Sequence, residues 1–361
     1  MTGRTAPEAA SLPGVFRAGR LSLVWRPWPV LITAVLLVAT LVAFCLSIGL
    51  GEFQISIPQV LATIFGQGDR ADSFVIMTLR LPRALIGLVV GLALGISGAL
   101  TQSIARNPLA SPDVLGVTSG AGTAAVLLVT VTGGAAGAIT ASIGLPAAAL
   151  AGGLGTGLGV YVMALRRGID GFRLLLIGVS ISAVLEAITN WLLVTADIRD
   201  VGRAQGYLVG SLDGRSWTDL WPALIGAAGL VLVVLAVAFQ LKPMHFGDDV
   251  AAGLGVRLPV VRAVLLLCAV LLAGVAVSAA GPVPFVALVA PQVAMRLLRF
   301  PTPPLVASGL CGALLVLGSD LIARTILPVP LPVGIVTATI GGPFLVFLLV
   351  RANLTKTAYR S

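Results

Sequence analysis

The sequence predicts an all-α polytopic membrane protein with ten transmembrane helices. Of its 361 residues, 58% are hydrophobic and 10% are charged, and the mean hydropathy is +1.06. Soluble domains carry about 25% charged residues, so a chain of this composition cannot hide its apolar surface from water and its solvent must be lipid. The 43 glycines and 22 prolines indicate kinked or broken helices, which membrane proteins tolerate where neighbouring helices satisfy the backbone.

The chain begins with a polar, basic segment, residues 1–28, which we expect to be a disordered cytoplasmic tail. The apolar run that follows, 29–50, is longer than the hydrophobic region of a signal peptide and has no A-x-A cleavage site. We therefore expect an uncleaved first span.

Ten apolar stretches are about long enough to cross a bilayer. No β alternation is sustained between them, which predicts one helical membrane domain over 29–351 and a cytoplasmic tail at 352–361. The expected spans are 29–50, 82–104, 114–132, 137–164, 172–195, 219–241, 261–280, 283–299, 303–323 and 332–351.

The basic residues orient these spans. With ten spans both termini lie on one side, and placing them inside puts 16 of the 23 Lys and Arg residues in inward segments. The positive-inside rule therefore predicts cytoplasmic termini.

Three of the seven outward basic residues lie at the ends of expected helices. Arg80 and Arg83 flank Pro82 at the start of the second span, and Arg324 lies at the outer end of the ninth. Long basic side chains can reach the lipid headgroups from helix ends. Alternatively, the three form a docking surface for an acidic partner. The tripeptide RLP opens the second span at 80–82 and recurs before the seventh at 257–259, on the opposite side, which is a hint of an inverted repeat.

Two inward segments are candidates for function. Pro108 and Pro112 interrupt any helix in the loop 105–122, which forms either a tight hairpin or irregular backbone lining a gate. The segment 242–260 is the longest inward one, and it is either a connector or a short helix that inserts into another protein. Asp248 and Asp249 are placed to cap that helix or to complement its N-terminus. Its exposed face would be Ala251, Ala252, Leu254 and Val256.

Two carboxylates fall within the expected spans. Asp320 precedes Arg324 by four residues, so the two meet on one helix face and Asp320 is expected to orient Arg324. Glu186 lies in the middle of the fifth span, where an acid is costly and therefore a functional candidate. A structural hydrogen bond or a water-facing position in a wide pore are the alternatives for Glu186.

Other chemistry is missing from the sequence. Cys45, Cys268 and Cys311 lie in apolar runs with no C-x-x-C pair, and His245 has no neighbouring ligand, so no metal site is expected. The chain has no P-loop, H-E-x-x-H or G-x-S-x-G motif and no basic stripe with interleaved aromatics. We expect no catalytic residues, no cofactor on this chain and no nucleic-acid partner.

Six ordered blocks together resemble the FecCD-type permeases of ABC importers for iron–siderophores, haem and vitamin B12. They span about residues 30–351. The blocks are LRLPRAL, GLALGISGALTQSIARNPLASPDVLGVTSGAG, AAGLGV, ALVAPQVAMRLL, SDLIAR and LPVGIVTATIGGPFLVFLL.

The resemblance implies a ten-helix subunit of the vitamin B12 importer permease type, built on an inverted repeat. It would pair with a second permease, itself or a paralogue. Two ATP-binding cassette subunits, which hold the ATP and Mg²⁺, and an extracytoplasmic binding protein would complete a complex in the bacterial cell membrane. This chain would be its non-catalytic transport subunit.

The resemblance also assigns roles to residues. Arg80, Arg83 and Arg324 match arginines that meet glutamates on the binding protein. Asn107, Pro108 and Leu109 match a cytoplasmic gate. Gln292 departs from the family pattern, in which His often follows the proline. The segment DDVAAGLGV matches the coupling helix that contacts the ATPases, through Asp248, Asp249, Ala251, Ala252, Gly253, Leu254 and Gly255.

The implied mechanism is alternating access, in which partner ATPases drive the inward movement of an iron(III)–siderophore complex. Cobalamin and haem are alternative cargoes. A secondary transporter coupled to an ion gradient through Glu186 and Asp320, or a passive channel or scaffold, are the alternatives from other classes.

Overall fold

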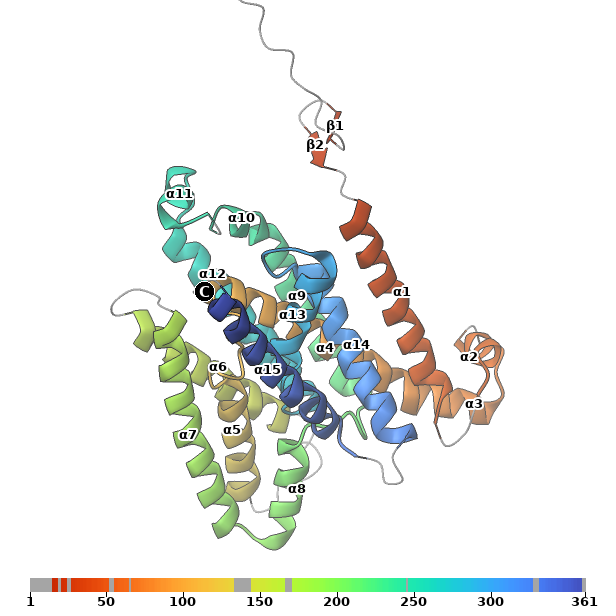
Figure 1. Cartoon of the computed structure of the whole chain (residues 1–361). Coiled ribbons are helices and arrows are strands. Elements are labelled where there is room, and N and C mark those ends of the chain that lie inside the picture. The colour runs from red at the N-terminus through yellow and green to blue at the C-terminus, as the bar shows by residue number, and fades with distance from the viewer. Residues whose placement is uncertain are drawn as a thin grey trace, which may run out of the picture.

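The computed structural model describes residues 15–18, 21–24, 27–51, 55–64, 66–132, 144–165, 171–244, 246–326 and 331–358. In these ranges the chain is a bundle of helices with one small hairpin attached (Figure 1). The elements are β1 (Val15–Ala18), β2 (Leu21–Val24), α1 (Pro27–Gly49), α2 (Ile57–Ile64), α3 (Arg70–Phe74), the π-helical turn η1 (Val75–Arg80), α4 (Leu81–Ala105), α5 (Val117–Thr132), α6 (Leu145–Leu165), α7 (Gly171–Thr195), α8 (Ile198–Leu208), α9 (Trp217–Val237), η3 (Ala238–Gln240), α10 (Leu241–Met244), α11 (Asp248–Gly253), α12 (Leu258–Ala280), α13 (Val286–Leu298), α14 (Leu305–Thr325) and α15 (Val333–Ala358).

The helices match the ten predicted spans. In the described part of the chain, seven helices are long and apolar enough to cross a bilayer, and three shorter apolar helices, from α5, α13 and α15, occupy the third, eighth and tenth predicted spans. The all-helical membrane prediction is therefore confirmed.

The centre of the bundle is α4, which packs against α12, α13 and α14. Small residues allow this close packing, because a Cβ atom built on Gly91 of α4 would lie 2.6 Å from the carbonyl oxygen of Gly312 in α14. The Ser97 hydroxyl of α4 donates a hydrogen bond of 2.5 Å to the Ala269 carbonyl of α12. The two helices that follow the RLP tripeptides are thus packed side by side.

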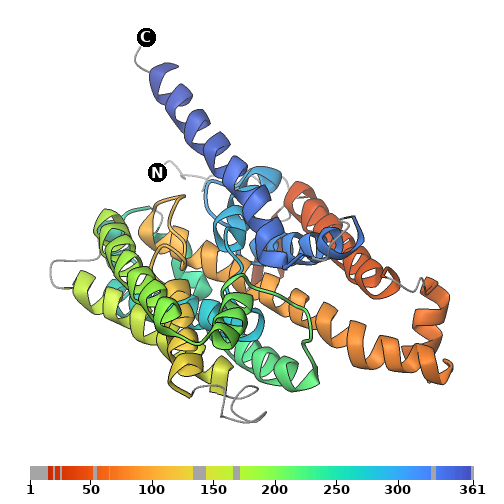
Figure 2. The same cartoon turned by 90° about the horizontal axis from the view of Figure 1, so that it is seen from below.

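The bundle, which Figure 2 shows from a second side, has two ends with ion-pair networks, and we name them after the arginines found there. At the Arg83 end lie the start of α4, the ends of α1 and α14, and the loop between α8 and α9. At the Arg106 end lie the end of α4, α10, α11 and the start of α12. Figure 1 shows α10 and α11 at the top of the bundle and α8 at the bottom.

The periphery of the bundle is apolar and uncovered. In the most apolar 18 residues of α7, only 17% of the residues are buried inside the chain, and the same share holds for the helix that contains α9. In the helix over residues 70–105 the share is 78%. Exposed apolar side chains such as Val184 (60% exposed) and Trp191 (64% exposed) are too closely spaced here for a surface that faces water. These faces therefore meet lipid or another subunit.

The second predicted span begins earlier than the expected residue 82. Helical backbone runs from Arg70 through η1 to Ala105, so Arg80 and Arg83 lie inside a continuous helix and not at its end. Pro82 has no N–H to donate and its ring crowds the preceding turn. The π turn before it accommodates this, with the Leu81 amide donating to the Ile76 carbonyl five residues earlier.

The tails also differ from expectation. Residues 15–18 and 21–24 pair as an antiparallel hairpin within the segment expected to be disordered, with Val15 opposite Val24. At the other terminus, α15 continues to Ala358, beyond the predicted end of the last span. Arg166, Arg167, His245 and the start of the predicted span 137–164 lie outside the described residues.

Candidate docking, coupling and gating sites

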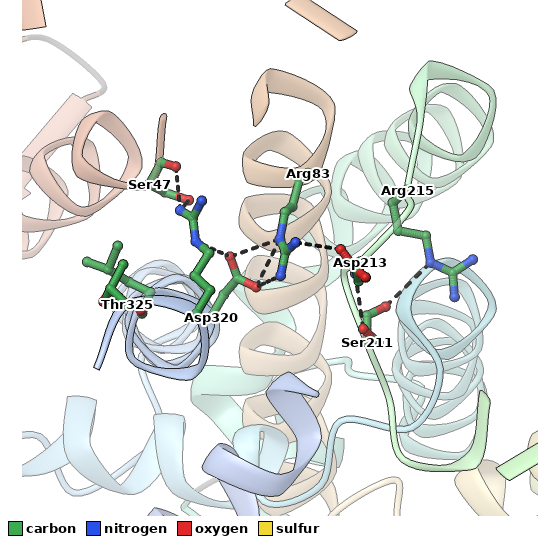
Figure 3. A network of polar contacts seen from close by, with 9 residues as sticks. Ser47, Arg83, Ser211, Asp213, Arg215, Asp320 and Thr325 are labelled. Carbon is green, nitrogen blue, oxygen red and sulfur yellow. Dashed lines mark hydrogen bonds and ion pairs between the residues drawn. The ribbon is translucent and has the colours of Figure 1, made fainter. Parts of the chain in front are cut away.

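The Arg83 end contains a network of charges centred on one buried carboxylate, Asp320 in α14, which is 1% exposed. Arg83 of α4 contacts it with two nitrogens, Nη2 at 2.9 Å and Nε at 3.2 Å from Oδ1. Arg324 lies one turn after Asp320, with its Nε 3.4 Å from Oδ2. The predicted contact between Asp320 and Arg324 is confirmed, and the same carboxylate also joins α14 to α4 (Figure 3).

Arg80 and Arg324 also donate hydrogen bonds to the end of α1. Arg80 Nη1 donates to the carbonyl oxygens of Ile48 (2.9 Å) and Gly49 (3.1 Å), and Arg324 Nη2 donates to the Ser47 carbonyl and, at 2.9 Å, to the Ser47 hydroxyl. The last carbonyls of a helix lack partners and carry partial negative charge, so basic side chains stabilise them. Arg80 is only 8% exposed as a result.

Arg83 also reaches out of the bundle. Its Nη1 lies 2.9 Å from Oδ1 of Asp213, an 84% exposed side chain on the loop between α8 and α9. No local pattern in the sequence predicts this pair, because 130 residues separate its members. Arg83 thus has one buried and one exposed carboxylate partner.

At the Arg106 end the backbone leaves α4 through a left-handed residue, Arg106 (φ 49°), and turns sharply. The Asn107 side-chain oxygen accepts a hydrogen bond of 3.0 Å from the Leu109 amide, which fixes the turn. Asn107 and Leu109 are half-buried and Pro108 is exposed. The non-helical backbone predicted for this loop is confirmed, since α5 begins only at Val117.

The segment 242–260 contains the predicted short helix, α11, and Asp248 ties it to the bundle. Asp248 Oδ1 accepts hydrogen bonds from Arg106 Nη2 at 2.5 Å and from Arg262 Nη2 at 2.7 Å. Arg106 Nη2 also donates to the Met244 carbonyl at 2.8 Å. Asp248 and Asp249 lie in the first turn of α11, where their charges complement its N-terminus as predicted. Neither caps the helix, because the N-cap residue is Gly247 and no side-chain cap hydrogen bond forms.

The charge of Asp248 is supported by these contacts. Partial burial raises the pKa of its carboxyl group, but hydrogen bonds from Arg262 and Arg106 outweigh that effect and hold the pKa below its ordinary value. Asp248 is therefore ionised at neutral pH, and the link between α11 and the end of α4 is ionic.

The exposed face predicted for α11 differs from the structure at two residues, since Ala251 is buried and Val256 is partly buried against the core. Ala251 is fully buried, because it packs into the core cluster that contains Met244 and Val261. Ala252 and Asp249 are exposed, and Leu254 is 66% exposed just after the helix. This end of the molecule thus presents an unpartnered leucine beside small residues.

Between these two ends lies a cavity of about 410 Å³. Glu186 of α7 lines it, as does Asp113, whose carboxylate accepts a hydrogen bond from the Thr118 hydroxyl. Glu186 is exposed, which fits the alternative of a water-facing acid. The lining residues are Ser111, Asp113, Val114, Ser119, Val179, Ser182, Ala183, Glu186, Pro284, Phe285, Leu288 and Leu345.

Phe285 is a further feature of this cavity that the sequence did not reveal. Its backbone is left-handed (φ 66°), which is rare for a bulky residue and costs of order 1–3 kcal/mol. A Cβ atom on Gly341 of α15 would lie 2.2 Å from Phe285 Cβ, so α15 closes against this residue. Packing of α13 and α15 holds Phe285 in place.

Gln292 of α13 lies in a buried pair. Its Nε2 donates to Gln102 Oε1 of α4 at 2.7 Å, and Gln102 Nε2 donates to the Leu288 carbonyl at 3.1 Å. Both side chains are under 10% exposed. The glutamine at this position therefore fastens α13 to α4 with neutral hydrogen bonds that do not depend on pH.

A membrane-spanning bundle with an open cavity that serines and two acids line in part, and with ionic networks at both ends, is the architecture of a polytopic transport protein. The chain belongs to the FecCD transport family, whose sequence model matches residues 38–351.

Curated relatives align over three quarters or more of their length. The ferric enterobactin transport system permease protein FepG of Escherichia coli (strain K12) is 39% identical over 90% of this chain and 98% of its own. The iron(3+)-hydroxamate import system permease protein FhuG of Bacillus subtilis (strain 168) is 35% identical over 90% and 98%. The cobalamin import system permease protein BtuC of Halobacterium salinarum is 37% identical over 79% and 75%.

A solved structure shares the fold. It is an inward-facing metal-chelate type ABC transporter chain, which superposes with a TM-score of 0.76 at 26% identity and covers 89% of this chain and 99% of that one. The vitamin B12 importer type of architecture expected from the sequence agrees with this likeness.

Proposed function

We propose that this chain is the permease subunit of a binding-protein-dependent ABC importer that carries an iron(III)–siderophore complex inward. The observation that carries the proposal is full-length similarity to permeases named for ferric enterobactin and iron(3+)-hydroxamate transport. A cavity of about 410 Å³ lined by serines and two acids fits a polar path for a chelate. Cobalamin is the alternative cargo, supported by the cobalamin permease among the relatives, and haem is a third.

The proposed complex contains a second permease, either another copy or a paralogue, and two ATPases that bind ATP and Mg²⁺. The uncovered face of α7 supports a permease partner, because Glu186 lies there among exposed apolar side chains and an acid facing lipid would be costly. This chain would contribute no catalytic residue of its own. Its termini would be cytoplasmic, with the Arg106 end inside and the Arg83 end outside, as the distribution of basic residues predicts.

The Arg83 end would receive the binding protein. Arg83 and Arg324 contact one buried carboxylate, Asp320, and Arg80 lies with Arg324 at the end of α1. Three positive charges thus gather at this end, and the surface attracts acidic side chains. Arg83 is 20% exposed and Arg324 13%, which leaves both within reach of an incoming glutamate.

The Arg106 end would receive the ATPases. Leu254 and Ala252 would insert into the ATPase dimer, and Asp248 would transmit the movement of α11 to Arg106. Arg106 directly precedes Asn107, Pro108 and Leu109, so a displacement of α11 would reach the proposed gate through one ion pair. This gives alternating access a physical link between ATP-driven closure and the path.

Uptake by the reconstituted complex tests the proposal. Proteoliposomes that contain the permease and its ATPases, with the binding protein outside, should accumulate ⁵⁵Fe-labelled siderophore only when ATP is enclosed on the side of the ATPases. A hydrolysis-deficient ATPase subunit should abolish the signal. Accumulation that persists with that subunit and follows a proton gradient would instead establish an ion-coupled transporter.

A further inference from the structure

The two carboxylates that Arg83 contacts differ greatly in exposure. Arg83 gives Nε and Nη2 to the buried Asp320 and Nη1 to Asp213, which lies in the open with 84% of its side chain exposed. Losing a buried carboxylate that accepts two hydrogen bonds from the arginine costs much stability, whereas losing one exposed ion pair costs little. Asp213 is therefore the partner that Arg83 can exchange.

The fold places Asp213 over Arg83 by anchoring the residue before it. Leu212 is fully buried, and a Cβ atom on Gly87, one turn after Arg83 in α4, would lie 3.1 Å from Leu212 Cδ1. The Ser211 amide donates to the Ala280 carbonyl at 2.8 Å, and the Ser211 hydroxyl accepts from the Asp213 amide at 3.0 Å. The loop thus presents one carboxylate to this guanidinium without relying on the ion pair itself (Figure 3).

We propose that Asp213 is an intramolecular competitor for the docking arginine, holding the position on Arg83 Nη1 that an acidic side chain of the binding protein takes. Docking is then an exchange of one carboxylate for another. This inference rests on the proposed function, because it assumes an acidic partner at the Arg83 end.

The exchange has a direct consequence for affinity. A new ion pair is gained only as an old one of the same kind is lost, so the net gain at Arg83 is small and the binding protein remains free to leave. Asp213 thereby sets the threshold that an acidic partner must exceed. Removing its charge should expose an unpartnered Nη1 and strengthen docking.

Asp213→Asn in the assembled permease–ATPase complex in nanodiscs tests the proposal. The probe is the binding protein that co-purifies with the complex, and its Kd is measured by biolayer interferometry at low and high salt. We expect the Kd to fall about two- to five-fold at low salt and less at high salt, the range typical of one exposed ion pair.

The matched control is Asp69→Asn. Asp69 is an exposed aspartate just before α3 that makes no side-chain cap, so it loses the same charge without touching Arg83. It should change the Kd much less than Asp213→Asn. In an Arg83→Gln background, Asp213→Asn should no longer tighten binding. Soluble hexaglutamate should compete for binding more effectively on Asp213→Asn than on the wild type.

The outcomes are separable. If wild-type complex binds the protein and imports chelate but Asp213→Asn leaves the Kd at the Asp69→Asn value or raises it, the competitor role is wrong and the importer stands. If Asp213→Asn tightens binding equally in the Arg83→Gln background, the effect is general charge and the role is also wrong. If no binding protein docks at all, both proposals fall.

Discussion

Replacing the buried carboxylate at the Arg83 end should destabilise the bundle far more than replacing the exposed one. Asp320→Asn keeps the size of the side chain but removes the charge that faces Arg83 Nη2 at 2.9 Å and Arg324 Nε at 3.4 Å. The guanidinium groups of Arg83 and Arg324 would then face a neutral amide oxygen in place of the buried carboxylate. Breaking a buried ion pair from one side costs about 3–5 kcal/mol.

We expect the lower end of that range for Asp320→Asn. The amide still accepts one hydrogen bond, Arg83 keeps Asp213, and Arg324 keeps its bonds to Ser47. A loss of about 3 kcal/mol lowers the folding equilibrium constant roughly 100-fold. The matched control Asp213→Asn, with an 84% exposed side chain on the same arginine, should cost about 0–1 kcal/mol.

Reversible unfolding in mixed detergent and dodecyl sulfate micelles, followed by tryptophan fluorescence, measures both variants. Trp217 reports near the site, because its indole donates to the Met77 carbonyl at 2.8 Å. If Asp320→Asn unfolds within about 0.5 kcal/mol of Asp213→Asn, Asp320 does not carry the charge that joins α4 to α14 and the reasoning fails.

Four other results are expected. Leu254→Glu should release the ATPases when the complex is extracted in detergent while the permease stays folded, since this leucine is 66% exposed, and a complex that survives intact would make the segment a connector. Asp248→Asn should raise the ATP hydrolysed per chelate imported, because α11 loses its bond to Arg106; an unchanged ratio would argue against this link. The pKa of Asp248 is lower in the folded protein than the ordinary value of an aspartate. Its ion pairs therefore stabilise the fold fully at a pH above the ordinary pKa, and this stabilisation is lost as the pH falls through the folded-state pKa. Acidification over that window should therefore destabilise the wild type more than Asp248→Asn. Glu186→Cys should react with a membrane-impermeant thiosulfonate in the assembled complex, and protection equal to that of the buried Cys311 would remove α7 from the path.

Much of the fold could be predicted because it depends on periodic composition. Runs of about 20 apolar residues define spans whatever their neighbours are, and Pro108 and Pro112 end a helix through local sterics. The contact between Asp320 and Arg324 was also local, four residues apart on one helix.

The partners of Arg83 and Asp248 could not be predicted from one sequence. Asp213 reaches Arg83 only because Leu212 is buried beside Gly87, and Arg106 reaches Asp248 only because the end of α4 lies beside the start of α12. Both contacts join residues more than 100 positions apart, so no local pattern records them. The early start of the second helix was missed for a different reason: a π turn lets a helix pass through Pro82, where the rule for α-helices predicts a boundary.

The two central helices, α4 and α12, converge on one carboxylate at the Arg106 end. Arg106 follows the last residue of α4, Arg262 lies in the first turns of α12, and both hold the same oxygen of Asp248. A force applied to α11 is therefore transmitted through one carboxylate to the two most buried of the seven membrane-length helices in the described part of the chain. Such a linkage favours a permease that tilts as a stiff block over one that bends helix by helix.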